Sequence, residues 1–509
     1  MNLLRALATV SGMTLVSRVL GFVRDAVIAA VFGAGLATDA FFVAFRIPNL
    51  LRRLFAEGAF SQAFVPILGE YKAQHGEAET KRLVDRVATT LTLALVVAAA
   101  LGVAAATLIV YLTAPGFAAD AEKFDLTVAM LRITFPYIVF ISLVSLAAGV
   151  LNTWSRFAIP AFTPTLLNVA FIVAALFGAR YFDPPVLVLA WAVLAGGVLQ
   201  LALQLPALAR IGLLPRPDFA PGDPGVRRIL VLMAPAIVGV SAGQINLLLN
   251  TIFASHLRTG SVSWLYFADR LMEFPTGLLG VALGTVLLPS LAKAFAEGAR
   301  EEYSSLLDWG LRLTFLLAVP AAAALAVLAT PLIATLFFHG RFGAEDLAMT
   351  RAALIAYSAG LLGLILVKIL APGFYGQQNI RTPVKIAFVA VAATQVLNFA
   401  LIGPLAHAGL ALAIALGACL NAALLYRGLR TREIYRPLPG WGPFLVKVAA
   451  AVALMAIVLA FAAGPAGWWT AADWRLRAAA LVGLVALGAV VYFAALWALG
   501  FRARDFVRK

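Results

Sequence analysis

Long apolar runs, separated by short clusters of charged residues, proline and glycine, follow one another along the whole chain. About fourteen of these runs reach the roughly 20 residues that an α-helix needs to cross the hydrocarbon core of a bilayer. The pattern therefore predicts an all-α polytopic membrane protein with about 14 transmembrane helices. The expected spans are 5–32, 37–68, 83–113, 126–151, 160–179, 186–209, 227–254, 263–292, 305–338, 349–375, 382–402, 406–429, 443–463 and 475–500.

Composition supports this fold class, because hydrophobic residues make up 63% of the chain and charged residues only 12%. A water-soluble globule of 509 residues could not cover its surface with so few polar side chains. The net charge of +15 does not indicate nucleic-acid binding, since the basic residues are not clustered with aromatic ones in a soluble region. No small-residue cleavage site follows the first apolar run, so we expect the N-terminus to remain a membrane helix.

Lysine and arginine are concentrated in every second loop, which predicts the orientation in the membrane. If the N-terminus is cytoplasmic, the inner loops and tails hold most of the loop charges, including the basic stretches 72–86, 427–447 and 502–509. The outer loops hold few, among them Lys123. Both termini are therefore expected inside. The basic loops are expected to contact anionic phospholipids of the inner leaflet.

Two proline landmarks repeat with one offset and indicate an internal duplication. Pro66 and Pro289 are 223 residues apart, and Pro160 and Pro383 have the same separation. Since this offset contains six spans, an even number, the two copies would share one membrane orientation. The sequence thus predicts an N-lobe at 1–214, a C-lobe at 226–436 and two additional helices at 437–509, with chance as the alternative explanation of the repeat.

Charged residues inside the first two spans are the first candidates for function, because a charge at bilayer depth is costly. In the first span, Ser17 and Arg24 are seven residues apart, as are Arg18 and Asp25, so they form a polar side of one helix. This side is expected to face a water-filled cavity or another helix.

In the second span the spacing of the charges would align them on one face of an unbroken helix. Pro48 interrupts this face, so the spacing leaves open whether Arg52 or Arg53 points inward. The aligned residues are Asp39, Arg46, Arg53 and Glu57.

The corresponding helix of the second lobe carries Asp269, Arg270 and Glu273. A cleft between the lobes would then be electropositive, because it would collect more arginines than carboxylates. Guanidinium groups bind phosphate oxygens bidentately, which favours an anionic, phosphate-bearing substrate. The arginines concerned are Arg18, Arg24, Arg52 and Arg270. Structural ion pairs between helices are the alternative for any single charge.

No motif indicates an enzyme. The chain lacks a phosphate-binding loop, and its GVSAG string at 239–243 lies inside an apolar span, not in the strand-to-helix context of a catalytic GxSxG motif. Its four histidines have no metal-ligand spacing, so neither catalytic residues nor a metal site are expected. The single Cys419 excludes a disulfide framework. For Lys368 and for the neutral residues Asn246, Asn250, Gln244, Thr394, Gln395 and Asn398, hydrogen bonding between helices is favoured over a ligand role.

Three motifs carry a resemblance to a known family. These are SRVLGFVRDAVIAAVFGAGLATDAFFVAFRIPNLLRRLFAEGAFSQAFVPIL at 17–68, FADRLMEFPTGLLGVALGTVLLPSL at 267–291 and FYGQQNIRTPVKIA at 374–387. The chain resembles the MurJ/MviN family of lipid II flippases over nearly its whole length. The resemblance implies the multidrug/oligosaccharidyl-lipid/polysaccharide (MOP) exporter superfamily, with two six-helix lobes in a V-shape around a central cavity. It implies alternating-access transport of lipid II in the bacterial cytoplasmic membrane, and a groove for the lipid tail at 437–509.

The resemblance also suggests residue roles. The family's essential cavity arginines match Arg18, Arg24, Arg52 and Arg270. Its acidic positions match Asp25, Asp39 and Glu57, and Ser17 and Ala29 match cavity positions; together with Arg53, Asp269 and Glu273 these are the accessory candidates. Some relatives have carboxylates at a sodium site in the seventh and eleventh helices, where this chain has Asn246, Asn250, Thr394 and Asn398.

Sodium coupling is therefore not expected, and no cofactor is expected beyond a membrane potential or another ion gradient. Enzymes of cell-wall synthesis are candidate partners. Two other functions stay open from the residues: a multidrug antiporter for organic cations, disfavoured by the arginine excess, and a scaffold in a cell-wall complex.

Overall fold

A computed structural model describes residues 3–53 and 60–502, and Glu57 lies outside these ranges. All regular elements within them are helical. The chain divides into two compact units, residues 1–260 and 261–509.

The number of helices agrees with the sequence prediction. Within the described ranges, nine helices are long and apolar enough to cross a membrane, and one of these, α18 (Arg381–Thr431), turns back on itself and so supplies two spans. Four further long segments correspond to the remaining apolar runs. They are α1 (Leu3–Phe32), α2 (Leu36–Leu51) with α3 (Phe60–Gln74), α10 (Pro224–Ser255), and α11 (Ser261–Pro275) with α12 (Val281–Ala296). The prediction of an all-α polytopic fold with about 14 spans is confirmed.

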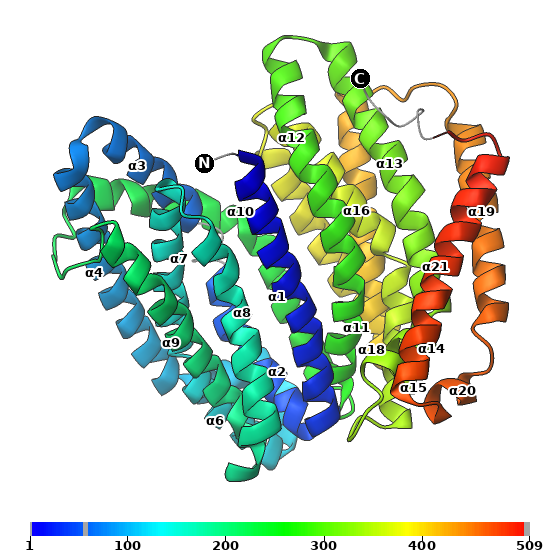
Figure 1. Ribbon diagram of the computed structural model, residues 1–509, viewed down its shortest axis with the longest axis horizontal. Coiled ribbons are helices and arrows are strands. Elements are labelled where there is room, and N and C mark those ends of the chain that lie inside the picture. The colour runs from blue at the N-terminus through cyan, green and yellow to red at the C-terminus, as the bar shows by residue number, and fades with distance from the viewer. Residues whose placement is uncertain (1–2, 54–59, 503–509) are drawn as a thin grey trace. The chain divides into compact units, whose positions relative to one another are not determined.

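In the N-terminal unit, α1 lies along α8 (Ala158–Val173), and α8 packs on α9 (Leu187–Arg210) (Figure 1). The helix α7 (Tyr137–Thr153) also packs on α9, and α2 packs on α6 (Ala121–Thr134). Two shorter elements, α5 (Ala106–Thr113) and η2 (Pro115–Ala119), connect α4 (Gly76–Ala104) to α6. The turns η3 (Ala174–Gly178) and η4 (Ala179–Tyr181) follow α8.

The helices α3, α4 and α7 share one apolar core with the start of α10, around the buried Phe64, Val84 and Val150. The linker before α10 is fixed by Arg86, which donates to Asp218 at 3.0 Å and to Asp223 at 2.6 Å. Since α10 packs on α3, it belongs to the first packing unit. The predicted lobe boundary at 214/226 comes from the internal sequence repeat and not from packing. Division by packing at 260/261 does not test it, so it stays a prediction.

The C-terminal unit packs around α13 (Arg300–Val327), which contacts α12 and α16 (Leu361–Leu370). The helix α15 (Ala344–Ser358) packs on both α11 and α18. A Cβ added to Gly360 would lie 2.3 Å from the backbone of Ala415, so α16 and α18 approach backbone to backbone. Short helices α14 (Ala329–Leu336) and α17 (Pro372–Tyr375) and the turn η5 (Thr276–Gly280) complete this part.

The helix α18 is a hairpin of two packed arms. It reverses at Ala406, which has a φ of 48°, two residues after Pro404. A Cβ at Gly409 would lie 2.2 Å from the carbonyl oxygen of Leu401, so the chain beyond the turn lies directly against the chain before it. The expected break between the spans 382–402 and 406–429 is therefore present.

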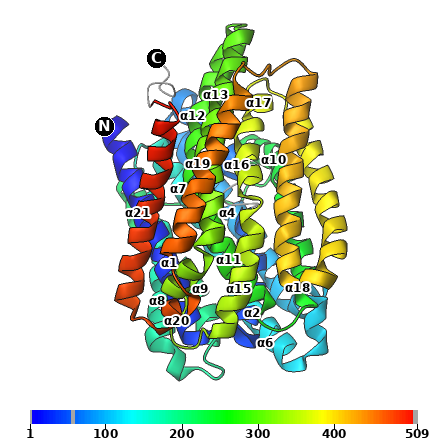
Figure 2. The ribbon, with the colours of Figure 1, turned by 90° about the vertical axis from the view of Figure 1, so that its right-hand side faces the viewer.

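The last two long helices, α19 (Trp441–Ala462) and α21 (Trp474–Ala498), form a pair that Figure 2 shows side by side, and α20 (Ala466–Ala471) lies between them in sequence. The pair is fastened to the unit at both ends. At one end α19 packs on α13. At the other, the buried Arg477 donates to the carbonyl oxygens of Ala334 at 2.7 Å and Phe338 at 3.2 Å.

Candidate functional site

The central feature of α1 is a buried ion pair between consecutive residues. Arg24 is 7% exposed and Asp25 is 1% exposed. The Nε and Nη2 atoms of Arg24 donate to the same oxygen, Asp25 Oδ1, at 2.8 and 2.7 Å. A charge at this depth needs compensation, and Asp25 supplies it. The pair is electrically neutral as it stands.

Two residues of α8 fix the guanidinium of Arg24 from the other side. The Oδ1 atom of Asn168 accepts from Arg24 Nη1 at 3.1 Å, and the ring of Phe171 lies 5.5 Å from the guanidinium carbon. Asn168 is itself oriented, because its Nδ2 donates to the backbone oxygen of Ser17 at 3.0 Å. A Cβ at Gly21 would lie 3.9 Å from Asn168 Nδ2, an ordinary van der Waals distance, so α1 and α8 approach closely here without requiring a glycine. The sequence prediction missed Asn168 and Phe171, whose apolar stretch gives no sign of them.

The other candidates on α1 differ in exposure. Arg18, six residues before Arg24, is exposed, and Ser17 is half-buried. Ala29 is fully buried, so its methyl group packs inside the unit. On this helix, Arg18 thus adds a positive charge that is accessible, whereas Arg24 presents a guanidinium held in a fixed plane.

Asp39, at the start of α2, forms a second buried ion pair. Lys123 Nζ donates to Asp39 Oδ2 at 2.8 Å, and the backbone N–H of Gly260 donates to the same oxygen at 2.7 Å. The side chains of Lys123 and Asp39 are 4% and 1% exposed. Lys123 Nζ also lies 4.2 Å from the ring centre of Phe117 and 3.4 Å from the hydroxyl of Thr259.

The sequence prediction placed Lys123 in a loop, but it is a helical residue. Asp120 caps α6 by accepting from the backbone N–H of Lys123 at 3.2 Å, which brings the lysine into the first turn of the helix. Asp120 signals this cap, because aspartate is a favoured N-cap residue. It does not signal that the lysine side chain turns toward α2.

The arginines of α2 have separate environments. Arg46 donates through Nη1 to the hydroxyl of Thr251 on α10. Arg52 Nε donates to Asn49 Oδ1 at 3.0 Å, and Arg53 is half-buried. Pro48 lies within α2, which continues to Leu51. Both Arg52 and Arg53 therefore stay candidates.

Arg270 belongs to the C-terminal unit, on α11. Its Nη1 donates to Glu273 Oε2 at 2.6 Å, and its guanidinium lies 5.4 Å from the ring centre of Tyr266. The side chain of Glu273 is 49% exposed, and Asp269 is also exposed. The Nε atom of Arg270 also donates to the hydroxyl of Tyr266 at 3.3 Å, so the described partners of this arginine lie on its own helix.

Two of the neutral polar residues, Asn250 and Asn398, donate hydrogen bonds within their own helix. Asn250 Nδ2 donates to the backbone oxygen of Asn246 at 2.7 Å, and Asn398 Nδ2 donates to Gln395 Oε1 at 3.1 Å. Lys368 Nζ lies 3.5 Å from the backbone oxygen of Thr276. In the described part of the chain, no group of three or more His, Cys, Asp or Glu side chains could hold a metal ion.

Comparisons with known proteins match this chain over nearly its full length. The family model described as "Lipid II flippase MurJ" matches residues 28–501. The chain belongs to the lipid II flippase MurJ family. A family member from Burkholderia cenocepacia, "Lipid II flippase MurJ", is 53% identical over 514 residues, with 100% of both chains covered.

Solved structures show the same fold. The structure described as "Lipid II flippase MurJ, inward closed conformation" matches with a TM-score of 0.82 at 24% identity, covering 98% of this chain and 99% of that one. An inward-facing multidrug resistance MATE family transporter of the MOP superfamily matches at a TM-score of 0.67 and 16% identity, covering 82% and 94%. The MurJ family members are flippases, not enzymes, and the resemblance read from the sequence is confirmed.

Proposed function

We propose that this protein moves lipid II from the inner to the outer leaflet of the bacterial cytoplasmic membrane by alternating access. Membership of the MurJ family and the full-length similarity to the Burkholderia cenocepacia flippase support this function. The observation that carries the mechanism is the neutral pair of Arg24 and Asp25 in the second half of α1. It is a preformed guanidinium fork whose internal counter-ion can be exchanged for a phosphate oxygen.

The exchange of counter-ions would leave the guanidinium in place. Asn168 and Phe171 hold its plane, so Arg24 keeps its geometry when the acceptor changes. Oxygens of the substrate diphosphate replace Asp25 Oδ1, and the return of Asp25 later displaces them. Arg18, Arg52 and Arg270 are the further proposed donors to the diphosphate. Asp25 thereby makes binding reversible, since an uncompensated buried arginine would hold a dianion too strongly.

The organisation of the chain in the membrane is part of the proposal. Residues 1–214 and 226–436 are the two transport lobes, both termini face the cytoplasm, and the helices of 437–509 hold the lipid tail. The apolar side chains exposed on α19 and α21 support the last point, among them Ile457, Phe461 and Val482. Association with enzymes of cell-wall synthesis stays a prediction.

An antiporter of organic cations, the alternative function, requires negative charge in the transport site. The two buried carboxylates of α1 and α2, Asp25 and Asp39, are each neutralised by a cation. The reconstituted protein is therefore expected to transfer fluorescent lipid II between leaflets of liposomes, measured with a membrane-impermeant quencher, and to leave a cationic dye in place. Accumulation of the dye without lipid II transfer would favour the antiporter.

We expect the membrane potential to drive transport, because the substrate is anionic and asparagines stand where some relatives have sodium-site carboxylates. In liposomes carrying a potassium diffusion potential, positive outside, the initial rate of lipid II transfer to the outer leaflet should rise several-fold over the rate without a potential. Replacing sodium by choline at constant potential is the control and should leave the rate unchanged. A sodium requirement at zero potential would contradict this proposal.

A further inference from the structure

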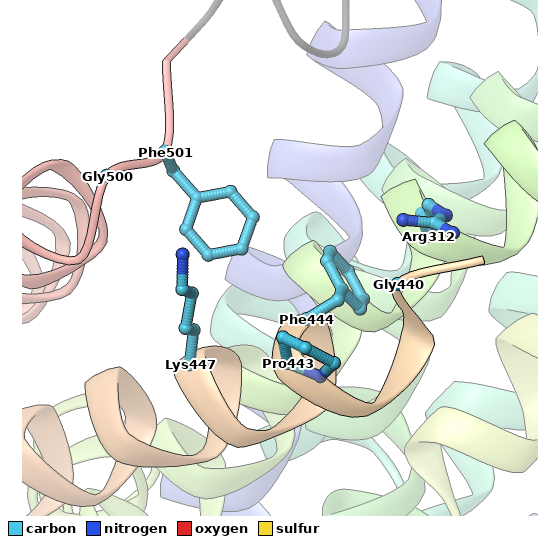
Figure 3. Close-up of a pocket in the computed structure, with 7 residues that line it drawn as sticks. All are labelled: Arg312, Gly440, Pro443, Phe444, Lys447, Gly500 and Phe501. Carbon is cyan, nitrogen blue, oxygen red and sulfur yellow. The ribbon is translucent and has the colours of Figure 1, made fainter.

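A basic pocket lies where α19 begins and α21 ends, inside the C-terminal unit (Figure 3). Its volume is about 270 Å³. It is lined by Arg312, Gly440, Pro443, Phe444, Lys447, Gly500 and Phe501. Because α19 and α21 are both apolar helices of membrane-spanning length, their ends place this pocket where hydrocarbon gives way to lipid headgroups.

Arg312 is held rigidly at one side of the pocket. Its Nε donates to the buried Asp308 at 2.7 Å, and its Nη2 donates to the backbone oxygens of Leu438 at 3.3 Å and Pro439 at 2.9 Å. Among the described residues, none accepts a hydrogen bond from Arg312 Nη1. The neighbouring residue on this side is Gly440, which has a φ of 92° and no side chain. A Cβ added there would lie 4.0 Å from Arg312 Nη1. One donor of a fixed guanidinium is therefore available.

Asp308, which holds Arg312 in place, accepts hydrogen bonds on both of its carboxylate oxygens. Asp308 Oδ1 accepts from Tyr435 at 2.7 Å, from Trp441 Nε1 at 2.8 Å and from the backbone N–H of Leu438 at 3.1 Å. Burial, and then the hydrogen bond to Asp308, raise the pKa of Tyr435 in the loop before α19, so its hydroxyl remains a donor. Asp308 thus cancels the charge of Arg312 and fixes its direction.

Lys447 supplies the uncompensated charge. It is half-buried, and its Nζ lies 5.6 Å from the ring centre of Phe501 (Figure 3). No described carboxylate forms an ion pair with it. The next cation, Arg502, is folded onto α21, where its Nη1 donates to the backbone oxygens of Trp497 at 2.8 Å and Phe501 at 2.9 Å. The pocket's lining, as far as the chain is described, therefore carries about one net positive charge.

The surroundings of the pocket are apolar and exposed. Val446 on α19 is 69% exposed, and Phe493 and Trp497 on α21 are 54% and 66% exposed. A free phosphate would gain nothing from these side chains, but acyl chains would cover them. The single net charge matches a phosphodiester, which carries one negative charge, better than a diphosphate. Basic pockets between membrane helices are a known mode of binding lipid headgroups.

We propose that this pocket binds the phosphate of an anionic glycerophospholipid, with Arg312 Nη1 and Lys447 Nζ as donors and with the acyl chains against α19 and α21. The site is separate from the Arg24 site, and the proposal goes beyond lipid II transport. The proposed orientation, with both termini in the cytoplasm, would place this lipid in the inner leaflet. The rest of the proposal does not depend on that orientation. The bound lipid would fasten the end of α21 to α19 and α13.

Binding to the full-length protein in detergent tests the proposal without a transport readout. After delipidation, native mass spectrometry is expected to give stoichiometric adducts with phosphatidylglycerol and weaker ones with phosphatidylcholine. Lys447→Gln should weaken phosphatidylglycerol binding about fivefold, which is the contribution of one basic residue near an anionic lipid. Lys447→Arg should retain binding. The matched control, Lys385→Gln on the exposed surface of α18, should bind as the wild type does.

Two results would overturn the proposal. The first is equal binding of phosphatidylglycerol to the wild type and to Lys447→Gln. The second is dependence on Lys447 for a polyprenyl diphosphate but not for phosphatidylglycerol, which would make the pocket part of the substrate path. If the protein bound phosphatidylglycerol but did not transfer lipid II, the result would contradict the proposed function and leave the lipid-binding proposal standing.

Discussion

Replacing Arg24 by alanine is expected to lower the rate of lipid II transfer at limiting substrate by about 100-fold. In the proposed mechanism Arg24 provides the bidentate donor pair for the diphosphate. A hydrogen bond to a charged group contributes about 1.5–3 kcal/mol, so losing this contact would cost roughly two orders of magnitude in affinity. Arg24→Lys keeps the charge without the fork and should recover only part of the activity. Transfer is measured in liposomes at matched protein content.

A structural role for Arg24 must be separated from a role in binding, because Arg24→Ala also removes a guanidinium that lies 2.7 Å from the buried Asp25. The double variant Arg24→Ala/Asp25→Asn removes that penalty and should fold normally, yet still fail to transfer lipid II. Arg180→Ala, which removes an exposed arginine of the same unit, is the control and should behave as the wild type. Full transfer by the double variant would show that the pair only stabilises the helix.

Replacing Lys123 by methionine is expected to destabilise the N-terminal unit strongly. Lys123→Met would remove the ammonium group that lies 2.8 Å from the fully buried Asp39, and breaking a buried pair in this way costs about 3–5 kcal/mol. The midpoint of thermal unfolding of the purified protein should fall by several degrees. Adding Asp39→Asn should restore most of the loss, because a neutral amide needs no counter-ion.

The matched control for Lys123 is an exposed ion pair in the same unit. Arg82 and Glu79 are 2.6 Å apart, but their side chains are 60% and 45% exposed. Arg82→Met should therefore change stability by less than about 1 kcal/mol. If Lys123→Met unfolds at the wild-type temperature, the buried pair contributes nothing to stability and Lys123 must be explained in another way.

The positions of the helices could be predicted because the length of an apolar run is a local property. The break inside α18 illustrates this, since the runs 382–402 and 406–429 already separate at the residues around Pro404. The polar side of α1 could be predicted for the same reason: seven-residue spacing places Arg18 and Asp25 on one face whatever surrounds them.

Which neighbour a polar face meets could not be predicted. Spacing placed Asp39 and Arg46 on a common face, but Asp39 pairs with Lys123 on α6, whereas Arg46 donates to Thr251 on α10. These partners come from 84 and 205 residues away, and helix periodicity contains no information at that range. Asn168 was missed for the same reason, because its role depends on the packing of α8 against α1.

The hairpin of α18 limits how the C-terminal unit can change shape. Its arms are joined at a single residue of positive φ, Ala406. They pack so closely that a Cβ added to Gly417 would lie only 2.0 Å from Thr394 Oγ1. Sliding one arm past the other would drive backbone into side chain. During a transport cycle we expect the two arms to move together as one rigid body, so that bending occurs at the ends of α18.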